Sequence, residues 1–183
     1  MNTSVSFEVL KEATARDRLE LLDLIKGVAT NEKTVGYHSD LSSEDEESYF
    51  CWLDSTLSDR NSVFIIGRDN DLVVFQLLIA FKFEPNNKHI ANLSKAIVHT
   101  RTRGKGVIEA VLPLIVEFCD QRRVSIVTLD AVKGSSAERR WKRMGFLEWG
   151  VMPHYSKTTE GTKEGSYMYQ TVDFLRQLCT GDE

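Results

Sequence analysis

Cysteines, long apolar runs and an excess of positive charge are all scarce or absent in this sequence. The cysteines are Cys51, Cys119 and Cys179, and their wide spacing fits neither a disulfide framework nor a zinc motif, so we expect no metal. No apolar run approaches the roughly 20 residues that cross a bilayer, and no basic segment followed by an apolar one opens the chain. These absences predict a cytoplasmic protein with no membrane partner.

The charge balance argues against a general polyanion binder. The formal net charge is −4 at pH 7 and the isoelectric point is about 5.6, so we expect no nucleic-acid partner. The 183 residues show no internal repeat and no linker-like stretch, and a chain of this length can bury a core without cross-links. We expect a single domain over residues 1–183.

A basic turn with two glycines separates a strand-like segment from a helix-like one. Residues 90–98 are rich in apolar and β-branched side chains, whereas apolar residues recur at helical spacing from 107 to 118. The start of a helix has unpaired N–H groups and partial positive charge, so it attracts phosphate, and Gly104 and Gly106 allow close approach. Positive side chains are added by Arg101, Arg103 and Lys105. Taken alone, the pattern fits an anion-binding turn and an ordinary solvated turn equally well.

The first half of the chain predicts two helices and a meander of strands. The expected strands are 5–10, 62–68, 72–83 and a run that ends at 98, and the expected helices are 14–26 and 42–57. Thr14 and either Ser42 or Ser43 are positioned to cap the helices, and residues 69–71 form a hairpin turn. The buried face expected for the first helix consists of Leu19, Leu22, Leu24 and Ile25.

The second half predicts helices alternating with strands. The expected helices are 105–121 and 135–144, and the expected strands are 124–129, 146–152 and 166–174, the last two joined by a loop over 156–162. Pro113 removes a hydrogen bond from the first of these helices and should kink it. The largely apolar strand that ends at Asp130 follows a crossover helix, so it should run parallel to the strand ending at Val98.

The resulting order, βααβββαβαββ with a basic glycine turn after the fourth strand, resembles the GCN5-related N-acetyltransferase (GNAT) family. The family's RxxGx[GA] turn can be aligned with residues 101–106 or with residues 103–108, and its aromatic and Gly-Phe signature falls on 137–146. The resemblance implies an α/β (α+β) fold. Its central sheet would be mixed and mostly antiparallel, with parallel strands four and five splayed apart and helices on both faces.

The resemblance also implies acetyl-CoA as cofactor and assigns residues to it. Backbone groups of the fourth strand would hold the pantetheine arm, and amides of the turn would hold the pyrophosphate. The cofactor-binding residues implied in this way are Ala96, Ile97, Val98, Arg101, Arg103, Gly104, Lys105, Gly106, Val107, Ile108, Ser135 and Trp141.

Segments 35–41, 129–137 and 153–161 look like the tabtoxin-resistance acetyltransferases, a patchy similarity over most of the chain. It implies a primary amine on a small molecule as acceptor, attacked directly in a ternary complex. Tyr37, His38 and Asp40 would then line the acceptor pocket; alternatively, they belong to a surface loop with Tyr37 packed on the core. Family members often form dimers, which allows a homodimer here, but the sequence shows no interface.

An ammonium acceptor must lose a proton before it attacks, so a base or a water chain is needed. Asp130 and His99 are the candidates, although a strand-end Asp often caps a turn and a lone His is often structural. Where many family members have a tyrosine that protonates the thiolate, this chain has Trp141, whose indole N–H is a poor acid, and Tyr155 is a substitute. The oxyanion of the intermediate also needs stabilisation.

A second departure from the family pattern keeps another function open. In the 103–108 alignment, Ile108 occupies a position where the family has Gly or Ala, and its side chain points into the core or crowds the pyrophosphate. The alternative is a catalytically degenerate fold that serves as an acyl-CoA-binding sensor or interaction module. Acetyl-CoA binding without turnover on any amine would favour it.

Overall fold

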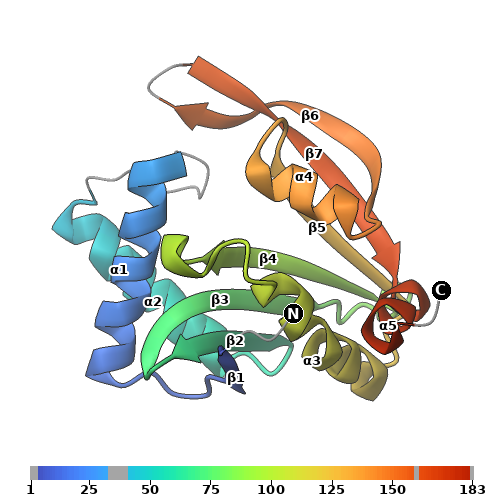
Figure 1. Cartoon of the computed structure of the whole chain (residues 1–183), viewed down its shortest axis with the longest axis horizontal. Coiled ribbons are helices and arrows are strands. Elements are labelled where there is room, and N and C mark those ends of the chain that lie inside the picture. Colours follow the sequence, from blue (N-terminus) through green and yellow to red (C-terminus); the bar gives the residue numbers. More distant parts are fainter. Residues whose placement is uncertain (1–3, 33–40, 159–160, 182–183) are drawn as a thin grey trace. The chain divides into compact units, whose positions relative to one another are not determined.

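The computed structural model describes residues 4–32, 41–158 and 161–181. The helices of this part are α1 (Ala15–Glu32), α2 (Ser43–Ser58), α3 (Val107–Arg122), α4 (Ser136–Arg143) and α5 (Val172–Thr180), with a short 3-10 helix η1 (Thr100–Thr102). The strands are β1 (Ser6–Val9), β2 (Ser62–Asp69), β3 (Leu72–Phe81), β4 (Ile90–Val98), β5 (Ile126–Val132), β6 (Leu147–Thr158) and β7 (Gly161–Thr171). Figure 1 shows these elements along the chain.

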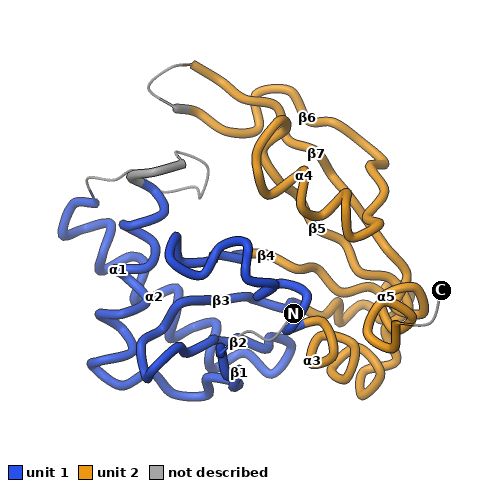
Figure 2. Tube along the Cα trace, in the orientation of Figure 1, with its two compact units in different colours: residues 1–80, 95–111 blue, residues 81–94, 112–183 orange. Residues whose placement is uncertain are grey.

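The strands follow the order β1-β2-β3-β4-β5-β7-β6 in one mixed sheet. β4 and β5 pair in parallel, whereas β1–β2, β2–β3, β5–β7 and β6–β7 pair antiparallel. The predicted mixed, mostly antiparallel sheet and the parallel strand pair are therefore confirmed. The chain divides into two compact units, Met1–Ala80 with Lys95–Val111 and Phe81–Ser94 with Leu112–Glu183, coloured separately in Figure 2. Whether they act as one domain stays a prediction.

In unit 1, local signals fix where the first helices begin. The Thr14 hydroxyl accepts the Asp17 amide at 3.1 Å and the Asp17 carboxylate accepts the Thr14 amide at 2.9 Å, which is a reciprocal cap. Ser42 and Asp45 make the same box at the start of α2. The helices therefore begin where predicted, although α1 runs past Lys26 to Glu32.

The core of unit 1 lies between α1, α2 and the sheet. It contains Leu10, Leu21, Leu22, Leu24, Ile25, Val28, Tyr49, Leu53, Phe64, Ile66, Val73, Leu78 and Ile97. The prediction that Leu19 belongs to this face is wrong, because its side chain is 62% exposed. Leu21 is buried instead, since helical spacing from Leu24, Ile25 and Val28 leads back to Leu21 and not to Leu19.

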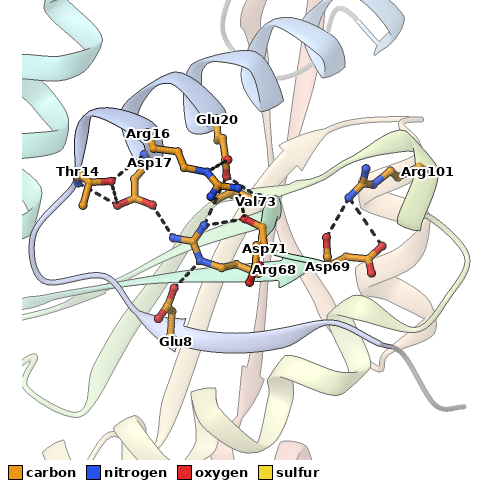
Figure 3. A network of polar contacts seen from close by, with 10 residues as sticks. All are labelled: Glu8, Thr14, Arg16, Asp17, Glu20, Arg68, Asp69, Asp71, Val73 and Arg101. Carbon is orange, nitrogen blue, oxygen red and sulfur yellow. Dashed lines mark hydrogen bonds and ion pairs between the residues drawn. The ribbon is translucent and has the colours of Figure 1, made fainter.

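Arg68 of the β2–β3 hairpin forms ion pairs with residues of β1 and α1 (Figure 3). The Arg68 guanidinium donates to the carboxylates of Asp17 at 2.5 Å, Glu8 at 2.7 Å and Glu20 at 3.4 Å. Glu20 also accepts the Val73 amide at 2.9 Å. β1, α1, β2 and β3 are therefore joined through a largely buried ionic cluster, in which each charge has an opposite partner.

The β2–β3 hairpin turns at Asn70 and Asp71, as predicted. Both residues have left-handed φ values, 51° and 64°, which is the conformation that a two-residue type I′ turn requires. Short polar side chains tolerate this conformation better than most.

Unit 2 differs more from the sequence-based expectation. β6 and β7 reach Thr158 and Gly161, so most of the predicted 156–162 loop is strand. The prediction of a strand to Phe174 is wrong at its end, because α5 begins at Val172, where the Thr171 hydroxyl accepts the Phe174 amide at 3.3 Å. Asp130 lies inside β5, which continues to Val132, and not at its end.

No helix of the described residues is long and apolar enough to cross a bilayer. The same residues contain no group of three or more His, Cys, Asp or Glu side chains arranged to hold a metal ion.

Candidate functional site

The glycine turn before α3 is compact and held by its own backbone. His99 precedes η1, and its carbonyl accepts the Thr102 amide at 3.0 Å. The amides of Arg103 and Lys105 donate to the carbonyls of Thr100 and Thr102, each at 3.3 Å. Gly104 and Gly106 have φ values of 74° and 75°, a conformation that glycine adopts at little cost.

These left-handed glycines leave a series of amides open at the start of α3. Among the residues that the structure describes, no acceptor takes the N–H groups of Gly104, Gly106, Val107 and Ile108. The first amides of any helix lack intrahelical partners. Here two of the unpaired amides, those of Gly104 and Gly106, also precede the helix. The Ile108 side chain is 7% exposed and therefore packs inside the protein. The turn thus combines unpaired backbone donors with the partial positive charge of a helix start.

The basic side chains of the turn are only partly available. The Arg101 guanidinium donates to the Asp69 carbonyl at 3.2 Å and lies 3.8 Å from the Asp69 carboxylate (Figure 3). Arg103 donates through Nε to the Val98 carbonyl at 3.2 Å. Lys105 is exposed. Among the three, the Lys105 side chain is the one that no hydrogen bond or ion pair of the described residues engages.

His99 is held in a way that limits its chemistry. Its Nδ1 accepts the Arg101 amide at 3.2 Å, so in the neutral ring the proton is on Nε2. Burial lowers the pKa of His99, and the charges of Arg101 and Arg103 lower it further. The neutral ring therefore has no lone pair left to accept a proton while this hydrogen bond persists.

The regular pairing of β4 with β5 ends before β4 reaches the glycine turn. Its parallel ladder with β5 consists of four pairs, from Ile90↔Ile126 to Leu93↔Leu129. Two residues after the last pair, Lys95 has a left-handed φ of 55°. Ala96, Ile97 and Val98, the residues predicted to hold the pantetheine arm, follow this irregularity, and Ile97 is buried.

In unit 2, two predicted catalytic residues are in direct contact. The Tyr155 hydroxyl donates a hydrogen bond to Asp130 Oδ2. Burial raises the pKa of Tyr155 above its usual value, and the hydrogen bond to Asp130 and the charge of that carboxylate raise it further. Asp130 Oδ1 accepts no hydrogen bond from any described residue, and no ion pair of these residues includes Asp130.

An irregularity in β6 directs Tyr155 toward Asp130. Between Met152↔Gly165 and Ser156↔Lys163, β6 advances four residues while β7 advances two, so β6 bulges at 153–155. His154 at the centre has a left-handed φ of 56°. The bulge places the Tyr155 ring over Gly165, which has no side chain to obstruct it.

Trp141 and Ser135 have structural partners of their own. The Trp141 ring is buried and packs edge-on against Phe146, with ring centroids 5.1 Å apart. The Ser135 hydroxyl accepts the Glu138 amide at 3.1 Å and caps α4. Neither observation tests a contact with a cofactor. Tyr37, His38 and Asp40, the predicted acceptor residues, lie outside the described residues.

Sequence reasoning missed Gly165, Tyr167 and Trp149. Tyr167 pairs with Asp130 across β5 and β7, and its ring lies 6.1 Å from that of Tyr155 and 5.8 Å from that of Trp149, measured between ring centroids. The alternation of Gly165, Tyr167 and Tyr169 along one strand was a signal that they share a face.

No family model matches the chain. Among solved structures, it resembles a GNAT acetyltransferase from Streptococcus pneumoniae at 17% identity and a TM-score of 0.70, with 91% of this chain and 98% of that chain covered. A GCN5-related N-acetyltransferase from Kribbella flavida is 20% identical with a TM-score of 0.69, covering 92% of this chain and 98% of that one. The structure of a Salmonella typhimurium protein with its cofactor acetyl-CoA is 12% identical with a TM-score of 0.71, covering 93% of this chain and 95% of that one.

None of these likenesses singles out the tabtoxin-resistance pattern, which stays a prediction. Each of them covers more than nine tenths of both chains, and the element order and the parallel β4–β5 pair agree with the predicted architecture. The chain therefore has the fold of the GCN5-related N-acetyltransferases.

Proposed function

We propose that the protein transfers an acetyl group from acetyl-CoA to an amine of a small molecule, which attacks the thioester directly in a ternary complex. The observation that carries this proposal is the set of unpaired amides at Gly104, Gly106, Val107 and Ile108, at the turn where the sequence resemblance expects the pyrophosphate. The fold alone would not specify an activity, because one fold serves many functions.

The residues of the turn fit a diphosphate group. Amides at a helix start provide donors and positive potential together, and the exposed Lys105 adds a positive charge at the same turn. Ile108 would not obstruct binding through its side chain, since that side chain is buried while its amide has no acceptor in the described chain. When bound, acetyl-CoA supplies an activated thioester. The chain would hold it and exclude water from it.

Of the two candidate bases, we assign the role to Asp130. His99 has its Nδ1 lone pair committed to the Arg101 amide, whereas Asp130 Oδ1 has no partner among the described residues. Oδ1 would accept a hydrogen bond from the acceptor's ammonium group and take one proton from it, which leaves a neutral amine whose lone pair attacks the thioester carbon. The Tyr155 hydrogen bond to Oδ2 would fix the carboxylate in one orientation.

Tyr155 is better suited to this positioning role than to protonating the thiolate. A thiol has a pKa of about 8.5, so a phenol whose pKa is raised further by burial is a weak proton donor to its thiolate. The Trp141 indole is buried against Phe146 and is not acidic. The thiolate would therefore leave largely without an acid from the protein, which slows transfer without preventing it.

Calorimetric titration of the full chain with acetyl-CoA tests the proposal, using Gly104→Asp and Gly106→Asp as variants. Gly104 is exposed and a Cβ there meets open space, so this variant should fold. Gly181→Asp is the matched control, since Gly181 has the same left-handed φ, 70°, at the end of α5. We expect at least tenfold weaker binding for both turn variants, because a carboxylate would repel the diphosphate.

Wild-type affinity in Gly104→Asp would mean that the turn does not hold the diphosphate. A second assay follows thiol release with a panel of small amines. Binding of acetyl-CoA without thiol release on any amine would favour the alternative, an acyl-CoA-binding module, over the transferase.

A further inference from the structure

The face of β5, β7 and β6 that bears Asp130 also bears a row of aromatic rings. Asp130 and Tyr167 are direct partners across β5 and β7, so their side chains lie on the same face of the sheet. The Tyr167 ring meets Tyr155 on one side and Trp149 on the other, in edge-on contacts with interplanar angles of 87° and 63°. We call Trp149, Tyr167 and Tyr155 the aromatic row. It leads from the edge strand β6 to the carboxylate.

The aromatic row is open at the end away from Asp130. Trp149 is 63% exposed and Met152 is 49% exposed. The Tyr167 hydroxyl donates a hydrogen bond to the Met152 sulfur, with 3.3 Å between oxygen and sulfur. Large apolar side chains gathered at one place on a surface usually mark a binding site. The row therefore offers flat apolar surface next to a negative charge.

The carboxylate at the inner end has an unmet demand for positive charge. Tyr155 occupies Oδ2, but Oδ1 accepts no hydrogen bond within the described parts of the chain. Two lysines of the same unit have other partners: Lys133 pairs with Glu148 at 3.8 Å and Lys142 pairs with Glu138 at 2.8 Å. A half-buried carboxylate without a cationic partner favours a ligand that carries one.

We propose that the acceptor is a compact organic ammonium ion with a flat apolar body, such as an arylalkylamine. Its ammonium group pairs with Asp130 Oδ1 and its body lies against Tyr167 and Trp149. The face of an aromatic ring attracts cations and also packs against flat apolar groups. Both the ammonium group and the apolar body of such a ligand therefore match the aromatic row. As a statement about the acceptor, this rests on the proposed acetyl transfer.

The binding itself is tested without any cofactor. Calorimetry on the full chain compares phenethylammonium with 2-phenylethanol, which lacks the charge, and with ethylammonium, which lacks the ring. We expect phenethylammonium to bind at least tenfold more tightly than either, because only this probe satisfies both the carboxylate and the aromatic row. Equal affinity for the charged and uncharged ring probes would overturn the proposal.

Two substitutions separate the contributions of charge and ring. Asp130→Asn keeps the shape and an oxygen for Tyr155, and should remove the preference for phenethylammonium over 2-phenylethanol. Trp149→Ala should weaken both ring probes about tenfold and leave ethylammonium unchanged. The matched controls are Asp173→Asn, an exposed carboxylate, and Leu178→Ala, an exposed apolar side chain, both on α5. Neither control should change any affinity.

Other outcomes have distinct meanings. Light scattering that shows a dimer abolished by Trp149→Ala would assign the exposed row to a second copy of the chain and overturn the proposal. If acetyl-CoA binds and phenethylammonium does not, the acceptor class is wrong while the transferase proposal stands. If phenethylammonium binds and acetyl-CoA does not, the cation site stands and the transferase proposal fails.

Discussion

The Tyr155 ring lies directly over Gly165. A Cβ atom added at Gly165 would come within 2.5 Å of ring atom Cδ2 of Tyr155, which is closer than real side chains approach. The ring and the glycine belong to neighbouring strands, β6 and β7, at the bulge that separates Met152↔Gly165 from Ser156↔Lys163. Gly165 therefore determines where the Tyr155 hydroxyl can reach, and through it how Asp130 is held.

Gly165→Ala should displace Tyr155 and break its hydrogen bond to Asp130. We expect acetyl transfer to a small amine to fall about tenfold in kcat, as in Tyr155→Phe, with acetyl-CoA affinity unchanged. The double variant should be no worse than either single one, since both remove the same contact. Gly150→Ala on β6 is the control, because a Cβ there meets no atom within 4 Å. Additive losses in the double variant would show that Gly165 acts independently of Tyr155.

The sequence predicted helix starts well because caps are local. Thr14 with Asp17, and Ser42 with Asp45, are three residues apart and make their bonds without help from the rest of the fold. Thr171 is the same kind of capping signal for α5. The alternation of residue types along the preceding strand nevertheless extended the strand prediction beyond Val172, where the helix begins.

The candidate site was predictable only in part. Asp130 and Tyr155 were separate candidates for base and acid, and their contact spans 25 residues and depends on a bulge that no local pattern signals. The Gly104 and Gly106 turn was recognisable because its chemistry is contiguous in sequence. The order β5-β7-β6, which brings Tyr167 beside Asp130, is a long-range property.

Replacing Arg68 should destabilise unit 1 strongly. Arg68→Met leaves the carboxylate of Asp17, which is almost fully buried, without its ionic partner, whereas Glu20 keeps Arg16 at 2.6 Å. Removing one member of a buried ionic group costs about 3 kcal/mol or more. Chemical denaturation at neutral pH measures this, with Arg176→Met as control, since the ion pairs of Arg176 are exposed. A loss no larger than that of the control would mean that the cluster in Figure 3 is not a stabilising element.

The same cluster should make stability depend on pH through Asp17. Burial disfavours its charge, but hydrogen bonds from Thr14 and Arg68 outweigh this and hold the pKa of Asp17 below its usual value. The stabilisation is therefore complete above the unfolded-state pKa of about 3.9 and is lost as the pH falls through the lower folded-state pKa. The difference in unfolding free energy between wild type and Asp17→Asn should shrink as the pH falls from about 5 to about 2. A constant difference over this range would contradict the lowered pKa.

Leu19 and Leu22 provide a paired test of which face of α1 is buried. Leu22→Ala removes a buried side chain and should lower the unfolding free energy by about 2–4 kcal/mol. Leu19→Ala changes an exposed one and should stay within about 0.5 kcal/mol of wild type. Urea denaturation of the two variants measures both values, and equal losses would mean that Leu19 is covered in solution.

The amide signals of the glycine turn test the central claim most directly. In proton–nitrogen correlation spectra of the full chain, addition of coenzyme A should shift the resonances of Gly104, Gly106, Val107 and Ile108 downfield, because their N–H groups gain phosphate acceptors. The same titration of Gly104→Asp should leave the remaining three in place. If coenzyme A moves none of these amides in the wild-type protein, the turn holds no diphosphate and the proposed transferase function is contradicted.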